Sequence, residues 1–287
     1  MIVRLAAFFL LSLSLFAQTT PAHPEMLVST QWLADHLRDS SLVIIQIGPK
    51  QNEYDAGHIP GARFLPNDHI VAERNGVKGE LLPDEQLVSN LEALGINNDS
   101  RIVIYASEYP TVATRLYWTL DYLGIADHAS LLNGGLQQWK AENRPVPTET
   151  LPFKPGKIQP HRRPEVLATA ADVQSATHSG TPLLVDSRPQ KRFAEGHIPG
   201  AVPLYWQQTV APDQITKFLD AGEIESAYKK AGVKPGTKVI TYCETGFQAT
   251  HSYFTLKYLG YDVKMYDGSF NEWNDVKHLP VVKDDKP

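Results

Sequence analysis

One feature constrains the fold of this chain more than any other: three of its segments occur twice, in the same order. The repeated pairs are Gly57–Ala62 with Gly196–Ala201, Tyr117–Gly124 with Tyr253–Gly260, and Gly134–Trp139 with Gly268–Trp273. The first pair is identical, the second matches at six of eight positions, and the copies lie 139, 136 and 134 residues apart. A period this long indicates two tandem domains rather than a solenoid of short repeats.

A proline-rich stretch separates the two copies. Its prolines are Pro147, Pro152, Pro155, Pro160 and Pro164. Because proline fixes φ and lacks an N–H, this density excludes a helix or a central strand and is typical of a semi-rigid linker. We therefore predict domain 1 over residues 24–146, a linker over 147–164 and domain 2 over 165–287.

Each copy alternates short apolar runs with stretches of helical spacing. The predicted strands are residues 42–45 and 101–105 in the first copy, and 182–185 and 238–242 in the second. Residues 250–259 show helical spacing and precede Gly260, which fits the glycine that commonly follows a helix. Short strands that alternate with helices predict an α/β fold, with a parallel sheet covered by helices on both faces in each domain.

The N-terminus has the pattern of a secretory signal peptide. Arg4 precedes the apolar run Leu5–Ala17, and small and polar residues follow it. A helix of this length would span only about 20 Å of a hydrocarbon core of about 30 Å, which argues against the alternative of an uncleaved membrane anchor. We expect residues 1–22 to be a signal peptide, cleaved after Ala17 or Ala22. The mature protein would be exported, periplasmic or secreted, without stable membrane insertion.

Composition excludes several classes of function. The formal net charge is −5 and the basic residues are scattered, which argues against a nucleic-acid partner. A single cysteine excludes internal disulfides, CxxC redox pairs and cysteine-rich zinc sites. The ten histidines show no spacing typical of metal ligands, so we predict no metal.

The single cysteine, Cys243, stands where α/β enzymes carry their chemistry. It directly follows the predicted strand 238–242, and a helix is expected to open near Ala249. A loop curled around the sulfur would point backbone N–H groups at it, with the helix N-terminus behind them. Gly246 permits the backbone conformation that such a tight loop needs. We expect this environment to lower the thiol pKa and to make Cys243 a nucleophile.

These residues resemble the tandem-domain rhodaneses, the thiosulfate/3-mercaptopyruvate sulfurtransferase family. The motifs that carry the resemblance are Val185–Arg188 followed by Arg192 and Phe193, the two segments Gly57–Ala62 and Gly196–Ala201, Cys243-x2-Gly246-x2-Ala249, and Asp267–Ser269 followed by Trp273. The resemblance covers essentially all of the chain after the signal peptide.

The resemblance implies a double-displacement reaction without a cofactor. The Cys243 thiolate would take the outer sulfur of a small-molecule donor, become a persulfide, and pass that sulfur to cyanide or a thiol. An acceptor protein outside the cytoplasm is left open as a further partner. In the first copy Ala106 follows Tyr105 where Cys243 follows Tyr242, and the loop after Ala106 is expected to be one residue longer. Only domain 2 can therefore carry a persulfide, with substrate held near the domain interface.

The predicted site is completed by a loop and three charged side chains. The loop residues expected to bind substrate are Glu244, Thr245, Gly246, Phe247, Gln248 and Ala249. The resemblance assigns Arg192 to the anionic donor. Asp186 and Arg188 are expected to form an internal ion pair that supports the loops.

The loop departs from the family pattern at its start. Family members that prefer thiosulfate carry basic residues after the cysteine, and those that prefer mercaptopyruvate carry small ones. Here Glu244 and Thr245 follow Cys243. A carboxylate beside the sulfur opposes thiolate formation and repels a dianion. We therefore expect thiosulfate to be a poor donor.

Two other functions compete with sulfur transfer by an enzyme. Phosphatases and arsenate reductases of the same fold need an arginine six residues after the cysteine, and this chain has Ala249 there. A carrier without turnover, which delivers a persulfide to a protein partner, would use the same Cys243 loop. Turnover with free donors and cyanide distinguishes the carrier from the enzyme.

Overall fold

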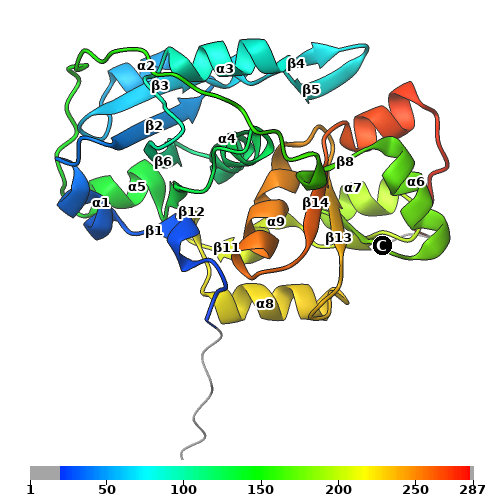
Figure 1. Ribbon diagram of the computed structural model, residues 1–287. Helices are drawn as coiled ribbons and strands as arrows, with labels where there is room; N and C mark the ends of the chain where they lie inside the picture. The colour runs from blue at the N-terminus through cyan, green and yellow to red at the C-terminus, as the bar shows by residue number, and fades with distance from the viewer. Residues whose placement is uncertain (1–19, 285–287) are drawn as a thin grey trace, which may run out of the picture.

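The computed structural model describes residues 20–284, which form two domains side by side (Figure 1). Most of the predicted signal segment, residues 1–19, lies outside the described residues. Within residues 20–284, no helix combines the length and the apolar character needed to cross a membrane.

The two halves of the chain run through matching series of strands and helices. Domain 1 contains β1 (Leu27–Val28), α1 (Thr30–His36), β2 (Leu42–Gly48), α2 (Gln51–Asp55), β3 (Ala62–Pro66), β4 (Val71–Arg74), β5 (Val77–Leu81), α3 (Asp84–Glu92), β6 (Arg101–Ala106), α4 (Pro110–Tyr122), β7 (Ala129–Leu132) and α5 (Gly135–Ala141). Domain 2 contains β8 (Leu167–Ala168), α6 (Ala170–Ser179), β9 (Leu183–Asp186), α7 (Gln190–Glu195), β10 (Val202–Pro203), β11 (Val210–Ala211), β12 (Gln214–Phe218), α8 (Ala221–Lys230), β13 (Val239–Tyr242), α9 (Phe247–Tyr258), β14 (Val263–Tyr266) and a π-helical turn over Asn271–Val276.

Each domain is built on a parallel sheet of five strands with the same strand order. The order is β1-β7-β6-β2-β3 in domain 1 and β8-β14-β13-β9-β10 in domain 2. Tyr105 of β6 pairs with Gln46 of β2, and Tyr242 of β13 pairs with Asp186 of β9, so the central strands are in the same register. Ala106 and Cys243 therefore lie at equivalent ends of equivalent strands.

Helices cover both faces of each sheet, which confirms the predicted α/β fold. In domain 1, Ile45 and Ile47 of β2 pack on the side of α3 and α4, and the alternate residue Ile44 packs on the side of α1, α2 and α5. In domain 2, Val239 faces α8 and α9, whereas Ile240 faces α6. Apolar residues on both faces are typical of a parallel strand buried on two sides.

The repeated glycine and tryptophan motifs anchor equivalent segments. Trp139 and Trp273 are each 1 % exposed. The indole N–H of Trp139 donates to the Pro145 carbonyl, and that of Trp273 donates to the Pro280 carbonyl, both at 2.8 Å. Each tryptophan thus fills the core and holds the segment that leaves its domain.

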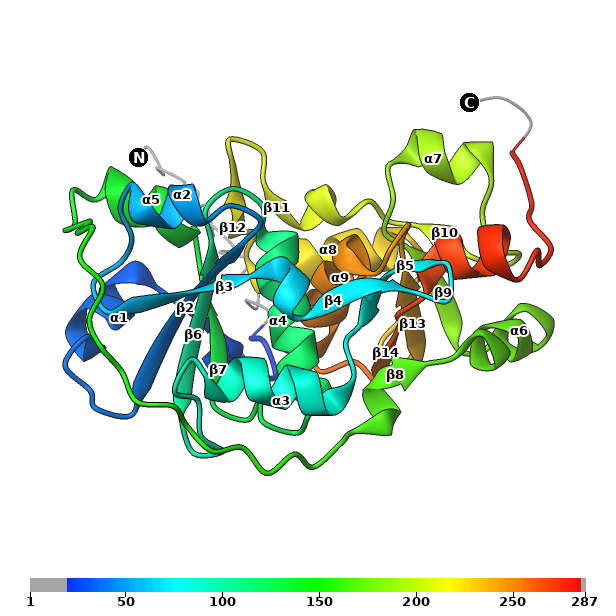
Figure 2. The same ribbon diagram turned by 90° about the horizontal axis from the view of Figure 1, so that it is seen from above.

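The helices α4 and α9 join the two domains through one continuous apolar core (Figures 1 and 2). They are equivalent helices, and they pack against each other around a local two-fold axis. At this axis the hydroxyls of Thr114 and Thr250 lie 3.0 Å apart. The rings of Tyr117 and Phe254 meet edge to face, with 4.9 Å between their centroids. This pairing fixes the position of one domain relative to the other.

A buried carboxylate strengthens this helix pair. Asp121 of α4 is fully buried and accepts a hydrogen bond from the Tyr253 hydroxyl at 2.6 Å. It also forms ion pairs with Lys257 of α9 and with Arg163, the latter at 2.9 Å. A buried charge is stabilising only when it is paired in this way.

Each domain also extends a hairpin over the other. The β4–β5 hairpin of domain 1 reaches domain 2, where the Leu81 N–H donates to Asp267 Oδ2 at 3.0 Å (Figure 2). The β11–β12 hairpin of domain 2 makes the matching contact, in which the Phe218 N–H donates to Asn133 Oδ1 at 2.9 Å. The ends of β6 and β13, where chemistry is expected, are therefore covered from the opposite domain.

Replacing the buried carboxylate should loosen the interface. Asp121→Ala leaves Lys257 and the Tyr253 hydroxyl without their partner and removes one of the two carboxylates that pair with Arg163. It should lower the free energy of unfolding by about 3 kcal/mol. The matched control is Asp127→Ala, because Asp127 pairs with Arg163 on the surface and should contribute less than about 1 kcal/mol. Urea unfolding measures the free energy of unfolding of both variants. An equal decrease in the two variants would contradict the proposed contribution of Asp121 to stability.

Candidate active site

Cys243 is held rigidly at the end of β13. Cys243 is 1 % exposed. Its N–H donates to the Ser269 hydroxyl at 3.2 Å, and its carbonyl accepts from the Phe270 N–H at 2.9 Å. Both partners belong to the loop after β14, so the sulfur is positioned by two neighbouring strand ends.

Backbone N–H groups converge on the sulfur, as expected for the loop. The amides of Thr245, Gly246, Gln248 and Ala249 donate towards it, and each of them lowers its pKa. Helix α9 begins at Phe247 and not near Ala249, so the expected helix start is wrong by two residues. The reason is Gly246, which caps the helix with φ of +84° and lets the first turn follow directly. Two of the four amides thus belong to the first helical turn, whose N–H groups lack intrahelical partners.

The thiol pKa shifts in the direction opposite to the one we expected. Burial raises the pKa of the Cys243 thiol above its usual value, and the four amides offset only part of this effect. A charged sulfur would lose all contact with water at this position, and that cost exceeds what the amide dipoles return. The four amides stabilise negative charge on the sulfur as it develops during a reaction.

Glu244 is partly exposed and its carboxylate points towards two arginines. Its carboxylate lies 3.2 Å from Arg188 Nη1 and 3.1 Å from Arg192 Nη2. Arg192, expected to bind the donor, is half-exposed and also pairs with Glu195 at 2.9 Å. The cation expected to hold an anionic donor is thus occupied by carboxylates of the protein itself.

Asp186 and Arg188 form the expected ion pair, with 2.7 Å between Asp186 Oδ2 and Arg188 Nη2. Both side chains are almost fully buried. The same Nη2 donates to the Gly196 carbonyl at 2.7 Å, and the guanidinium lies over the Phe270 ring at 4.0 Å. Arg188 therefore ties the end of β9 to the turn after α7 and to the loop that holds Cys243.

Domain 1 contributes a residue that the sequence did not indicate. Arg115 of α4 is fully buried, and its Nη2 lies 2.6 Å from Asp267 Oδ1 and 2.9 Å from the Gly79 carbonyl. An ideal Cβ on Gly246 would lie 2.7 Å from Arg115 Nη1. No motif marks Arg115, because this contact arises only when the two domains pack together.

The equivalent loop in domain 1 cannot form the same environment. Three residues lie between Ala106 and α4, and three lie between Cys243 and α9. The extra residue expected in this loop therefore lies within α4, which has 13 residues against 12 in α9. Tyr109 caps α4 with extended backbone, and Pro110 at the first helical position has no N–H. Domain 1 thus lacks the thiol, and its turn into the helix lacks the left-handed glycine cap of domain 2.

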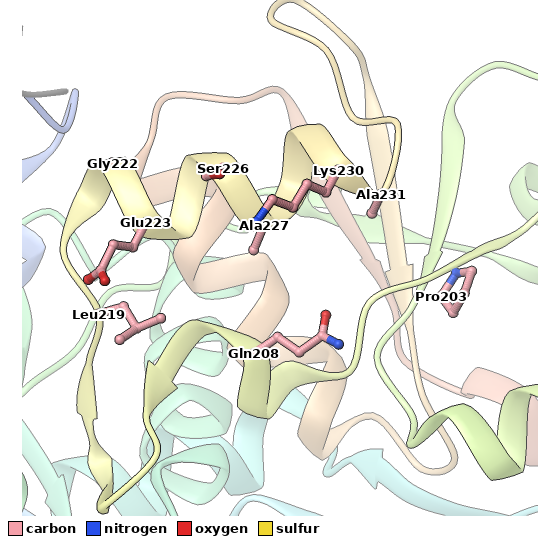
Figure 3. A pocket seen from close by; sticks show the side chains of 9 residues that line it. All are labelled: Pro203, Gln208, Leu219, Gly222, Glu223, Ser226, Ala227, Lys230 and Ala231. Carbon is pink, nitrogen blue, oxygen red and sulfur yellow. The ribbon is translucent and has the colours of Figure 1, made fainter. Parts of the chain in front are cut away.

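Two cavities lie on domain 2. One, of about 290 Å³, has Arg188, Arg192, Glu195 and Lys283 in its wall. The other, of about 690 Å³, lies between α8 and the segment that carries Gln208 (Figure 3). None of the predicted site residues lines this second cavity.

Gly246→Ala should disrupt the loop. Alanine at this position would have to keep a φ of +84°, which residues with a Cβ rarely adopt. Its Cβ would also lie 2.9 Å from the Asp267 carbonyl oxygen and 2.7 Å from Arg115 Nη1. Gly236→Ala is the matched control, since Gly236 has φ of +78° and open space around it. We expect Gly246→Ala to lower the free energy of unfolding by about 1–3 kcal/mol more than Gly236→Ala. Thermal unfolding of both variants measures this difference, and equal losses would argue against crowding at Gly246.

Comparisons with known proteins agree with the geometry. The sulfur carrier protein TtuD of Thermus thermophilus is 34% identical over 284 residues, covering 91% of this chain and 98% of that protein. A thiosulfate sulfurtransferase of Corynebacterium glutamicum is 30% identical and covers 91% of each chain. The crystal structure of SseA from Escherichia coli, described as a 3-mercaptopyruvate sulfotransferase, superposes with a TM-score of 0.78 at 27% identity and covers 85% of this chain and 98% of that one.

The family itself follows from a direct match along the chain. The Rhodanese-like domain matches residues 29–142 and again residues 169–276. These two ranges contain four of the five strands of each sheet and the equivalent strand ends at Ala106 and Cys243. The resemblance found in the sequence motifs is confirmed: this chain belongs to the rhodanese family and contains two rhodanese-like domains.

Proposed function

We propose that this protein is a sulfurtransferase that moves a sulfane sulfur from a small-molecule donor to a thiophilic acceptor through a persulfide on Cys243. The observation that carries the proposal is the convergence of four backbone amides on a single buried sulfur at a strand end. Relatives that align along nearly the whole chain are named sulfurtransferases, which supports the same reading.

In the first step the Cys243 sulfur attacks the outer sulfur of the donor. A new S–S bond forms while the S–S bond of thiosulfate or the C–S bond of 3-mercaptopyruvate breaks, and the leaving group takes the electron pair. Sulfite leaves in the first case. In the second, the enolate of pyruvate leaves and accepts the proton that the thiol gives up. No external oxidant or reductant is needed.

In the second step the acceptor attacks the outer sulfur of the persulfide. Cyanide leaves as thiocyanate, or a thiol leaves as a persulfide, and the electron pair returns to Cys243. The amides of Thr245, Gly246, Gln248 and Ala249 stabilise the negative charge on sulfur in both steps. They are fixed by the backbone and need no reorganisation when charge develops.

The site favours a donor with low charge and a basic leaving group. Because burial raises the pKa of the Cys243 thiol, a donor whose leaving group takes up the thiol proton is favoured. An enolate accepts this proton readily, whereas sulfite is a weaker base. A donor anion must also displace Glu244 from Arg192, and this is harder for a dianion next to a carboxylate. We therefore propose 3-mercaptopyruvate, or a donor like it, over thiosulfate.

A carrier without turnover is the second candidate. The relative named as a sulfur carrier protein is 34% identical to this chain, and the same Cys243 environment would hold a carried persulfide. Steady-state thiocyanate formation from a free donor and cyanide supports the enzyme. A single loading, released only to a protein acceptor, supports the carrier.

We also propose that the protein is exported. The basic Arg4 and the apolar run Leu5–Ala17 support this proposal. Fractionation of the native host, followed by N-terminal sequencing of the mature chain, measures it. A full-length protein confined to the cytoplasm would contradict it.

Cys243→Ser should abolish sulfur transfer while the protein stays folded. We expect the rate to fall by roughly a thousandfold or more, since serine cannot form a persulfide. Mass spectrometry of the donor-treated wild type should find one added sulfur atom on Cys243. The matched control adds Ala106→Cys to the serine variant, and activity should not return, because α4 is capped by Tyr109 in extended backbone rather than by a left-handed glycine such as Gly246. Undiminished activity of Cys243→Ser would overturn the proposal.

Glu244→Gln should improve the use of anionic donors. Removing the carboxylate frees Arg192 Nη2 and lowers the KM for thiosulfate by about threefold, the effect of one half-exposed ion pair. Glu195→Gln is the matched control, because Glu195 pairs with the same arginine but does not adjoin Cys243. Kinetics with thiosulfate and 3-mercaptopyruvate measure the change. An unchanged KM for thiosulfate in Glu244→Gln, or the same change in both variants, would contradict the role of Glu244.

A further inference from the structure

Domain 1 keeps a cavity at the place where domain 2 carries its chemistry. The cavity has a volume of about 270 Å³ and lies at the ends of β2 and β6, with Ala106 in its wall. Ile47 and Val112 form apolar walls, Tyr109 lines it as a half-exposed ring, and Phe247 closes it from domain 2. A concave, mostly apolar site at the end of parallel strands is where α/β domains bind small molecules.

The charged positions of the catalytic domain are reversed or lost around this cavity. Tyr54 and Phe193 stack on equivalent histidines, and the residue before each is Glu53 in domain 1 and Arg192 in domain 2. The shared register of β2 and β9 likewise places Gly48 where domain 2 has Arg188. In domain 1, Glu53 therefore stands at the position of Arg192, and Gly48 stands at the position of Arg188.

The remaining polar groups favour a cation. Glu53 and Glu108 both line the cavity, and together they raise the pKa of the nearby Lys50. That one exposed lysine, 2.9 Å from Glu53, can balance only one of the two carboxylates. Glu108 has no ion pair within 4 Å among the described residues. No arginine or lysine appears among the residues that line the cavity.

Two further observations indicate a ligand rather than an empty gap. Thr111 lines the cavity and is 8 % exposed, yet among residues 20–284 its hydroxyl has no hydrogen-bond partner. A hydroxyl that lines a cavity and has no partner within the protein is free to bond a ligand or water there. The rings of Tyr109 and Phe247 also lie in the wall, and aromatic faces attract organic cations.

We propose that the cavity of domain 1 binds a small organic ammonium ion. Its apolar or aromatic part would contact Ile47, Val112 and the two aromatic rings, and its ammonium group would lie by Glu53 and Glu108. The former catalytic position has thus exchanged an anion site for a cation site. This inference does not rest on the proposed sulfur transfer, since it concerns residues that cannot carry a persulfide.

Three probes of the same shape but different charge test the proposal by titration calorimetry on the full chain. Benzylamine should bind at least about fivefold more tightly than benzyl alcohol, which corresponds to one favourable charge interaction. Benzoate should not bind measurably. Binding of benzoate as tight as that of benzylamine would overturn the proposal.

Variants assign the binding to this cavity. Ala106→Leu should fill the cavity and abolish benzylamine binding, and Glu53→Arg should weaken it at least about fivefold without altering the interior. Glu149→Arg, an exposed charge reversal in the linker, should leave binding unchanged, and so should Cys243→Ser. Circular dichroism checks that each variant is folded. If Ala106→Leu does not fold, Glu53→Arg still tests the proposal. Unchanged binding in Glu53→Arg, or loss of binding in Cys243→Ser, would place benzylamine elsewhere and contradict the proposal.

Discussion

Hydrogen bonding from the backbone to one buried sulfur is the interaction on which the site depends. It requires Gly246 to adopt a left-handed conformation, so that α9 begins four residues after Cys243 and its unpaired N–H groups face the sulfur. Side chains contribute little directly, because the nearest charged residue in the loop, Glu244, points to arginines and not to the sulfur. The groups that stabilise charge on the sulfur are therefore mainly backbone amides, whose positions depend on the loop conformation. A short sequence motif is sufficient to identify such a loop.

Residues of domain 1 help to hold this loop in place. Asp267, which belongs to the loop after β14, is paired with Arg115 and accepts a hydrogen bond from Leu81, and both of these residues come from domain 1. Gly79 of the same hairpin approaches the Thr245 carbonyl so closely that any side chain there would collide with it. The domain that lost its nucleophile has thus kept the contacts that support its partner.

Much of this could be predicted from the sequence, because the relevant signals are local. The duplicated segments indicate two domains, and the apolar run before Cys243 places the thiol at a strand end. The start of α9 could not be predicted to the residue. The same amino-acid sequence is compatible with a helix that begins directly after a left-handed Gly246 and with a longer loop before the helix. The direction of the thiol pKa shift depends on how completely the sulfur is buried, and no pattern of letters measures burial. Arg115 was missed because its partners belong to the other domain.

The exchange of hairpins between the domains has a consequence for the history of the chain. Each half covers the strand end of the other, as in a dimer of identical subunits, but here one chain carries both halves. Once the halves were joined, a change at one strand end no longer had to be matched at the other. A single polypeptide can thus hold two equivalent sites with different occupants, a division of labour that a symmetric homodimer cannot achieve.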